Sequence, residues 1–163
     1  MQYFSTDVTE FLFLLAKHRV HYLIVGGEAV IYYGHARLTG DIDLFYDTAA
    51  RNVKRLHAAL DEFWSGDIPG IAGERELARR GMIFQFGVPP NRIDLITALS
   101  GLEFSKSWEN KEAVSLSRKR KKFPIYYIGL GDLIANKRAV GRARDDDDLR
   151  YLTAARRRRR RRS

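Results

Sequence analysis

The chain has 163 residues, of which 45% are hydrophobic, and a formal net charge of +9. This length predicts about one domain with enough apolar content for a packed core. The chain contains no cysteine, which excludes disulfides, thiolate catalysis and cysteine-based zinc sites, and its four histidines are scattered without metal-ligand spacing.

Most of the positive charge lies in one segment, residues 156–162, which consists of seven consecutive arginines. Without them the net charge of +9 falls to +2. A run of like charges repels itself and attracts polyanions. We therefore predict a folded domain over residues 1–155 and a disordered arginine-rich tail over 156–163, which acts either as an RNA-tethering arm or as a solvated segment.

The sequence carries no signal for a membrane. No segment approaches the roughly 18 to 20 apolar residues that a bilayer span needs. Asp7 and Glu10 also stand where a signal peptide would be basic. We expect a soluble, cytoplasmic protein with no membrane partner.

The N-terminal half reads as an alternation of helices and strands. Asp7 and Glu10 form a capping box, which predicts that a helix begins near Val8 and continues to His18. Hydrophobic periodicity then predicts a strand, a short helix, a second strand and an amphipathic helix, over residues 22–25, 28–33, 41–46 and 52–63.

The C-terminal half begins with a loop and a short helix near residues 74–80. Two strand pairs follow, over 82–86 with 92–97 and over 113–116 with 124–128, and then two helices over 130–140 and 145–155. The basic cluster 118–122 lies between the second pair of strands. It is either a hairpin turn that touches RNA or a solvated loop.

A possible metal site follows the first strand. Gly26 and Gly27 let the backbone approach a phosphate closely at the start of a helix. Asp41 and Asp43 are two residues apart in a strand, so their side chains project from the same face. Neighbouring carboxylates repel unless a cation lies between them, and Mg²⁺ prefers such oxygen ligands. Asp94, a lone acid in an apolar strand, also needs a cation if it is buried.

These residues together resemble the nucleotidyltransferase superfamily, which has the polymerase-β-like fold. Its members carry a glycine pair, an Asp-x-Asp motif and a third acid on a later strand, here Gly26-Gly27, Asp41 with Asp43, and Asp94. More narrowly, segments 34–39, 132–137, 142–145 and 148–149 look like those of small bacterial nucleotidyltransferases related to abortive-infection toxin–antitoxin toxins.

The resemblance implies a mixed α/β (α+β) domain of the nucleotidyltransferase fold, with a twisted sheet flanked by helices and a C-terminal helical pair. It implies that Asp41, Asp43 and Asp94 are catalytic and bind Mg²⁺ or Mn²⁺. It also implies a set of nucleotide-binding residues: Gly26, Gly27, Arg37, Thr39, Lys137, Asp145 and Asp148. Thr39 in addition fits a structural hydrogen bond at the start of the carboxylate strand.

The implied reaction moves a nucleoside monophosphate from a nucleoside triphosphate (NTP) to a hydroxyl of RNA, such as tRNA, or of a protein, and a cognate antitoxin is a further possible partner. Two alternatives stay open. In the first, the chain is a catalytically silent binding or regulatory protein of this fold. In the second, it is an RNA-binding module driven by its basic segments. Without the resemblance, Lys137 reads as a solvated lysine. Residues 145–148 then read either as acids that favour a helix start or as partners of the arginine tail.

Overall fold

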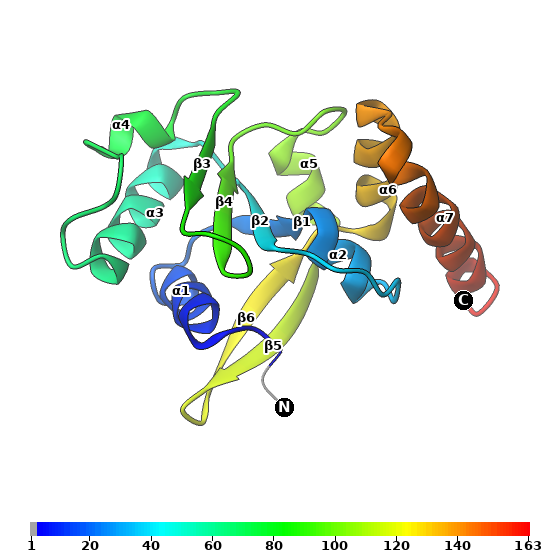
Figure 1. The fold of residues 1–163 in the computed structure, drawn as a ribbon, viewed down its shortest axis with the longest axis horizontal. Helices are drawn as coiled ribbons and strands as arrows, with labels where there is room; N and C mark the ends of the chain where they lie inside the picture. The colour runs from blue at the N-terminus through cyan, green and yellow to red at the C-terminus, as the bar shows by residue number, and fades with distance from the viewer. Residues whose placement is uncertain (1–2) are drawn as a thin grey trace.

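A mixed six-stranded sheet, in the order β3-β4-β2-β1-β6-β5, forms the centre of the computed structural model, which describes residues 3–163 (Figure 1). Neighbouring strands are antiparallel in the pairs β1/β2, β3/β4 and β5/β6 and parallel in the pairs β1/β6 and β2/β4. The strands are β1 (Tyr22–Val25), β2 (Asp41–Tyr46), β3 (Ile83–Phe86), β4 (Arg92–Ile96), β5 (Glu112–Arg118) and β6 (Lys121–Tyr127).

Helices flank this sheet, with α6 and α7 paired at the opposite end of the molecule from α3 and α4 (Figure 1). This arrangement confirms the predicted fold class, including the C-terminal helical pair. The helices are α1 (Thr6–Lys17), α2 (Gly26–Tyr32), α3 (Ala50–Phe63), α4 (Glu74–Leu77), α5 (Phe104–Glu109), α6 (Leu130–Val140), the 3₁₀ helix η1 (Ala143–Asp145) and α7 (Asp146–Arg160).

The core explains why the carboxylates face outward. All four residues of β1 are buried, as expected for a central strand. Burial alternates over the first four residues of β2, so that Ile42 and Leu44 are buried while Asp41 and Asp43 are partly exposed. Burial of the apolar face therefore fixes the face on which both carboxylates lie.

Three details differ from the sequence prediction. The side chain of Ser5, not a box formed by Asp7 and Glu10, caps α1 by accepting a hydrogen bond from the Val8 N–H at 3.3 Å. Helix α2 begins at the glycine pair itself rather than after it. Helix α5 was not predicted, because its six residues are too few for a clear helical periodicity.

The predicted disorder of the arginine tail is wrong for its first five residues, 156–160, which form the last turns of α7. Arginine is a good helix former. The helix also has Asp146, Asp147 and Asp148 in its first turn and arginines in its last turn, a distribution that the helix dipole favours. Arg159 is held to the body by Glu112 at 2.8 Å.

None of the helices in the described part of the chain combines the length and apolar character that a bilayer span requires.

Candidate active site

The three predicted carboxylates converge on two neighbouring parallel strands. The register of β2 with β4 pairs Asp43 with Asp94 and Asp41 with Arg92. One carboxylate oxygen from each of the three acids lies within 4.8 Å of the others. Asp94 is only 5% exposed, whereas Asp41 and Asp43 are partly exposed. The acids that are far apart in the sequence thus form one cluster, because the sheet places their strands side by side.

Burial and neighbouring negative charges shift the pKa of Asp43. Desolvation, followed by the negative charges of Asp41 and Asp94, raises the pKa of Asp43 from 3.8 to about 7. Ionised Asp43 is therefore unfavourable without a cation nearby. The cluster offers only hard oxygen ligands, which are the ligands that Mg²⁺ and Mn²⁺ prefer. The residues present fit a divalent cation of this kind.

The glycine pair lies directly beside this cluster. Gly26 has a positive φ of 62°, and a Cβ atom at this position would stand 2.1 Å from Oδ2 of Asp43. Only glycine fits here, because the backbone conformation and the close approach both exclude a side chain. Gly27 is less tightly enclosed, since a Cβ atom there would stand 3.0 Å from Oγ1 of Thr39.

Thr39 orients the first carboxylate. Its hydroxyl Oγ1 lies 3.1 Å from Oδ1 of Asp41 and 3.0 Å from the backbone oxygen of the same residue. These contacts agree with the structural hydrogen bond that we predicted. Thr39 thus reaches the site through Asp41, at the point where the loop after α2 enters β2.

Arg92 is a site residue that the sequence analysis missed. Its guanidinium pairs with Asp41 at 2.5 Å and with Asp94 at 3.0 Å. One signal was available, because Arg92 precedes Asp94 by two residues in the same strand and must therefore lie on the same face.

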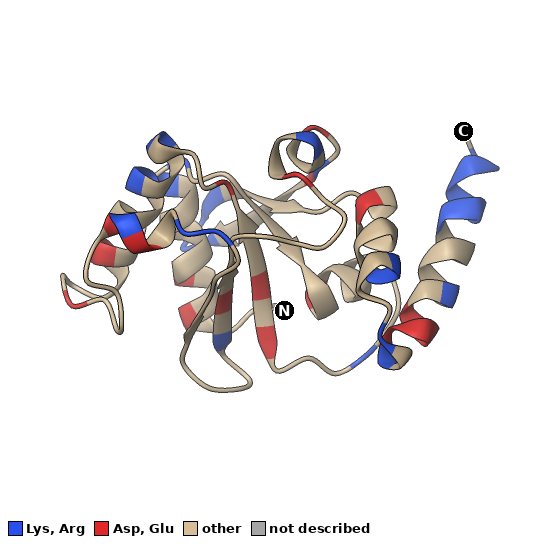
Figure 2. Cartoon of the chain, turned by 90° about the horizontal axis from the view of Figure 1, so that it is seen from above, with Lys and Arg blue, Asp and Glu red and all other residues tan. Residues whose placement is uncertain are grey.

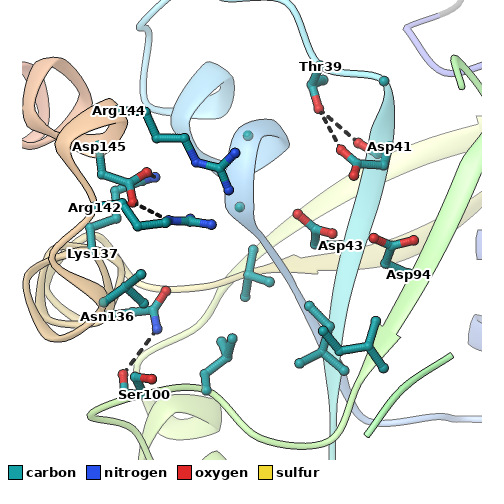
Figure 3. A pocket seen from close by; sticks show the side chains of 18 of the residues that line it. Thr39, Asp41, Asp43, Asp94, Ser100, Asn136, Lys137, Arg142, Arg144 and Asp145 are labelled. Atoms are coloured by element: carbon teal, nitrogen blue, oxygen red, sulfur yellow. Dashed lines mark hydrogen bonds and ion pairs between the residues drawn. The ribbon is translucent and has the colours of Figure 1, made fainter. Parts of the chain in front are cut away.

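A cavity of about 540 Å³ opens between the carboxylate cluster and the C-terminal helices (Figure 3). The glycine pair, Arg37 and Thr39 line it beside the acids. The opposite wall includes residues from α6 and from the segment that follows it, namely Asn136, Lys137, Arg142, Arg144 and Asp145. Asn136, Arg142 and Arg144 were not predicted as site residues.

The cavity is divided into an acidic side and a basic side. Figure 3 shows the side chains of Arg142 and Arg144 extending from the helical wall towards the cavity, across from Asp43 and Asp94. Arg142 donates to Asp145 at 2.8 Å through Nε. Among residues 3–163 no carboxylate forms an ion pair with Arg144. A ligand with several negative charges could therefore span from a cation at the acids to these arginines.

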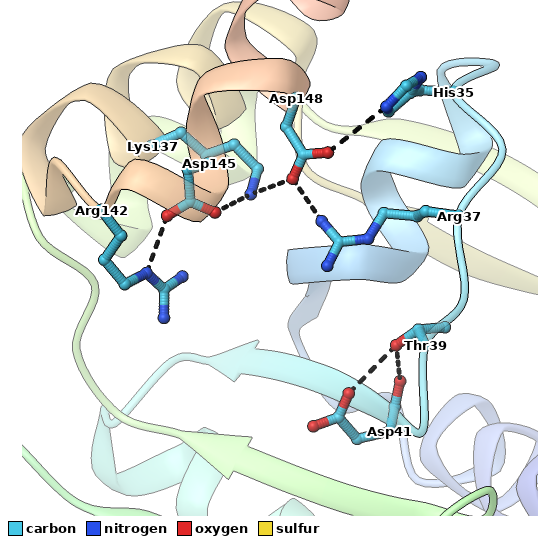
Figure 4. Close-up of polar contacts among 8 residues, drawn as sticks. All are labelled: His35, Arg37, Thr39, Asp41, Lys137, Arg142, Asp145 and Asp148. Carbon is cyan, nitrogen blue, oxygen red and sulfur yellow. Dashed lines mark hydrogen bonds and ion pairs between the residues drawn. The ribbon is translucent and has the colours of Figure 1, made fainter.

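Lys137 is held in a buried ionic cluster (Figure 4). It is only 5% exposed, and its Nζ lies 2.9 Å from Asp145 and 3.0 Å from Asp148. It is thus not the solvated lysine of the alternative reading. Its predicted contact with a nucleotide stays a prediction, since Lys137 borders the cavity while two carboxylates already engage its ammonium group.

The two acids of this cluster share Lys137 but differ in their other partners. Burial alone would raise the pKa of Asp145, but hydrogen bonds from Lys137 and Arg142 more than offset this and lower it. Asp148 forms an ion pair with Arg37, and His35 lies 3.8 Å away from it. The cluster therefore joins α6 and α7 to the loop that leads into the carboxylate strand (Figure 4).

Comparison with known proteins supports this reading of the chain. No curated protein matches it. A protein-family model described as a nucleotidyltransferase of unknown function, DUF6036, matches residues 6–155. This match includes β1 to β6, the glycine pair, all three carboxylates and both C-terminal helices as far as residue 155. The chain therefore belongs to this family of nucleotidyltransferases.

Proposed function

We propose that this protein transfers a nucleoside monophosphate from an NTP to a hydroxyl of RNA, in a reaction that depends on Mg²⁺ or Mn²⁺. One observation carries the proposal: three carboxylates with oxygens within 4.8 Å of one another lie on the wall of a cavity of about 540 Å³. Small-molecule sites typically have volumes of roughly 300 to 1,000 Å³.

In this proposal Asp41, Asp43 and Asp94 hold the metal. A bound divalent cation would neutralise the triphosphate and lower the pKa of the attacking hydroxyl. Gly26 and Gly27 let the backbone approach the phosphates, since neither position admits a side chain without a close contact. Thr39 keeps Asp41 in place by its hydrogen bond to Oδ1.

The basic wall has a matching role. Arg142 and Arg144 would bind the phosphates that become the leaving group, because charge develops there as the bond breaks. The acceptor hydroxyl releases its proton to water and its oxygen forms a bond to the α-phosphorus, the bond from this phosphorus to the bridging oxygen breaks, and pyrophosphate leaves with the electron pair of that bond. Lys137 acts by positioning the wall through Asp145 and Asp148.

Apolar side chains at the cavity support a ligand that carries a base. Leu38 is 97% exposed, and Ile83 and Val140 are 57% and 38% exposed. All three line the cavity. Exposed apolar residues gathered at one place commonly mark a binding site. They offer apolar contact for a nucleobase or for the end of an acceptor.

The choice of RNA as the acceptor rests on a basic groove between the two C-terminal helices, of which α6 also contributes residues to the cavity. Arg138, Arg150 and Arg157 line a groove of about 360 Å³ between α6 and α7. All three are exposed, and Figure 2 shows that basic residues continue along α7 towards its C-terminal end. A row of arginines on a helical pair suits a phosphate backbone. A protein hydroxyl is the other acceptor, which the test must distinguish from RNA. A role as a toxin with a cognate antitoxin is compatible with either acceptor.

The test is incubation of the purified protein with each α-labelled NTP, Mg²⁺, and either a pool of RNA or a protein extract. We compare the wild type with Asp41→Asn/Asp43→Asn and with the control Asp61→Asn/Asp67→Asn, whose residues are exposed and lie outside the cavity. Label on RNA from the wild type and the control, but not from the site variant, supports the proposal.

Label on protein alone would show that the acceptor is a protein and not RNA. Equal labelling by the site variant would overturn the assignment of the active site. Retained NTP binding without transfer to either pool would favour a catalytically silent member of the family.

A further inference from the structure

Arg92 lies where a cation is expected in the carboxylate cluster. Its Nη2 is 2.5 Å from Oδ2 of Asp41. The same guanidinium donates to Asp94 twice, from Nε at 3.0 Å and from Nη2 at 3.1 Å. Such forked contacts are among the stronger interactions of arginine with a carboxylate. One side chain thus bridges two of the three predicted metal ligands.

Every carboxylate oxygen of the two bridged acids accepts at least one hydrogen bond. Oδ1 of Asp41 accepts from Thr39 at 3.1 Å, and Oδ2 of Asp94 accepts additionally from Gln85 at 3.3 Å. Asp43 differs, because no basic side chain among the described residues forms an ion pair with it. Direct ion pairing of the clustered acids is therefore confined, among the described residues, to Asp41 and Asp94, whereas Arg92 acts on Asp43 only through its charge at a distance.

We propose that Arg92 is an internal counterion of the carboxylate cluster and must leave Asp41 before a divalent cation can bind there, so that metal binding depends on nucleotide binding. This depends on the proposed function, because it takes the cluster to be a metal site. Arg92 is then a positioning residue that controls access to the metal ligands.

The dependence on nucleotide follows from charge. Arginine stays protonated under all ordinary conditions. A cation held by Asp41 and Asp94 repels the displaced guanidinium and weakens its pairing with Asp94, so the guanidinium needs another anionic partner. A metal ion alone supplies none. An NTP in the cavity does, because Arg92 lines this cavity and the triphosphate carries several anionic oxygens. Metal and nucleotide should therefore each increase the affinity of the other.

The test measures Mn²⁺ binding from the electron paramagnetic resonance signal of the free ion, which requires no catalysis. Wild type, Arg92→Met and Arg92→Lys are titrated with and without a non-hydrolysable NTP analogue. We expect Arg92→Met to bind Mn²⁺ on the order of tenfold more tightly than wild type without the analogue, within the range of typical couplings between sites. The analogue should strengthen binding less in this variant. Arg92→Lys keeps the charge but loses the forked contact, so its Mn²⁺ affinity should lie between those of wild type and Arg92→Met.

Arg118→Met is the matched control. Arg118 has a similar side-chain exposure to Arg92, 26% against 30%, and it pairs with a single acid, Glu10, at 3.1 Å. It lies outside the cavity at the end of β5. Its removal should leave the Mn²⁺ affinity at the wild-type value.

A measurement on the wild type covers the case in which Arg92→Met does not fold. The Nη–H groups of the Arg92 guanidinium, which donates to Asp41 from Nη2, are observed by NMR, with the resonance assigned by its absence in Arg92→Lys. We expect a shift when Mg²⁺ and the analogue are added together, and a much smaller shift with the same Mg²⁺ concentration alone. An unchanged resonance at saturating Mg²⁺ and analogue would show that Arg92 stays in place, which overturns the inference.

The failures can be told apart. Equal or weaker Mn²⁺ binding by folded Arg92→Met overturns the role of Arg92 while the metal site stands. No Mn²⁺ binding by any variant, with or without the analogue, overturns the metal site and the proposed function together.

Discussion

Gly26 packs directly against Asp43, so closely that a Cβ atom on Gly26 would stand 2.1 Å from Oδ2 of the carboxylate. The contact joins the start of α2 to the centre of the acidic cluster. The glycine pair is therefore in direct contact with the carboxylate cluster.

Gly26→Ala is expected to displace Asp43 and to lower nucleotidyl transfer by more than about tenfold, with a loss of stability of at least about 1–2 kcal/mol from the left-handed backbone. Steady-state kinetics and denaturant unfolding measure the two effects. Gly70→Ala is the matched control, because Gly70 has a similar φ of 71° but no atom within 4 Å of its added Cβ. The control should lose stability only. Equal activity of the two variants would contradict the proposed contact.

The pKa of Asp43 predicts a pH dependence of stability. Between pH 3.8 and about 7 the folded protein holds more protons on Asp43 than the unfolded chain does. The free energy of unfolding of the metal-free protein should therefore fall as the pH rises through this window and level off above it. One pKa unit corresponds to about 1.4 kcal/mol, so the change is on the order of a few kcal/mol.

Chemical unfolding in the presence of a chelator, from about pH 4 to 8, tests this expectation. Asp43→Asn removes the titrating group, so the difference in stability between wild type and variant should change over the window. Parallel curves for the two proteins would rule out the raised pKa.

Lys137→Met should destabilise the protein by about 3–5 kcal/mol, because it leaves the buried acids Asp145 and Asp148 without their shared partner. Adding Asp145→Asn to this variant should recover part of the loss. A double-mutant cycle by denaturant unfolding measures the coupling. If Lys137→Met instead keeps its stability and loses NTP binding, the lysine is a nucleotide ligand, as the family resemblance implies.

The arginine groove predicts a salt-dependent RNA affinity. The triple change Arg138→Gln/Arg150→Gln/Arg157→Gln should weaken RNA binding and reduce the slope of log K against log[salt] by about 2 to 3, while NTP binding stays unchanged. Filter binding at several salt concentrations gives both quantities.

A triple change to glutamine at Lys119, Arg120 and Lys121 removes the same charge from the turn between β5 and β6 and from the first residue of β6. It should have little effect on RNA binding. The reverse ranking of the two triple variants would move the RNA interface to this turn.

The sequence by itself determined the local elements and the identity of the acids. The predicted strand over 22–25 matches β1, where all four residues are apolar and buried, and the predicted carboxylate strand over 41–46 matches β2, where burial alternates from Asp41 to Leu44. Both patterns are local properties of the chain. The same alternation placed Asp41 and Asp43 on one face before the neighbours of their strand were known.

Tertiary structure decided which charges meet. The parallel register of β2 and β4 brings Arg92 to Asp41 across 51 positions of sequence, and no periodic pattern encodes this pairing. Packing of α6 and α7 likewise buries Lys137 between Asp145 and Asp148, although a lysine on a helix is usually solvated. Long-range electrostatic contacts depend on the assembled sheet and helices, whereas hydrophobic periodicity depends only on residues that are close together in the sequence.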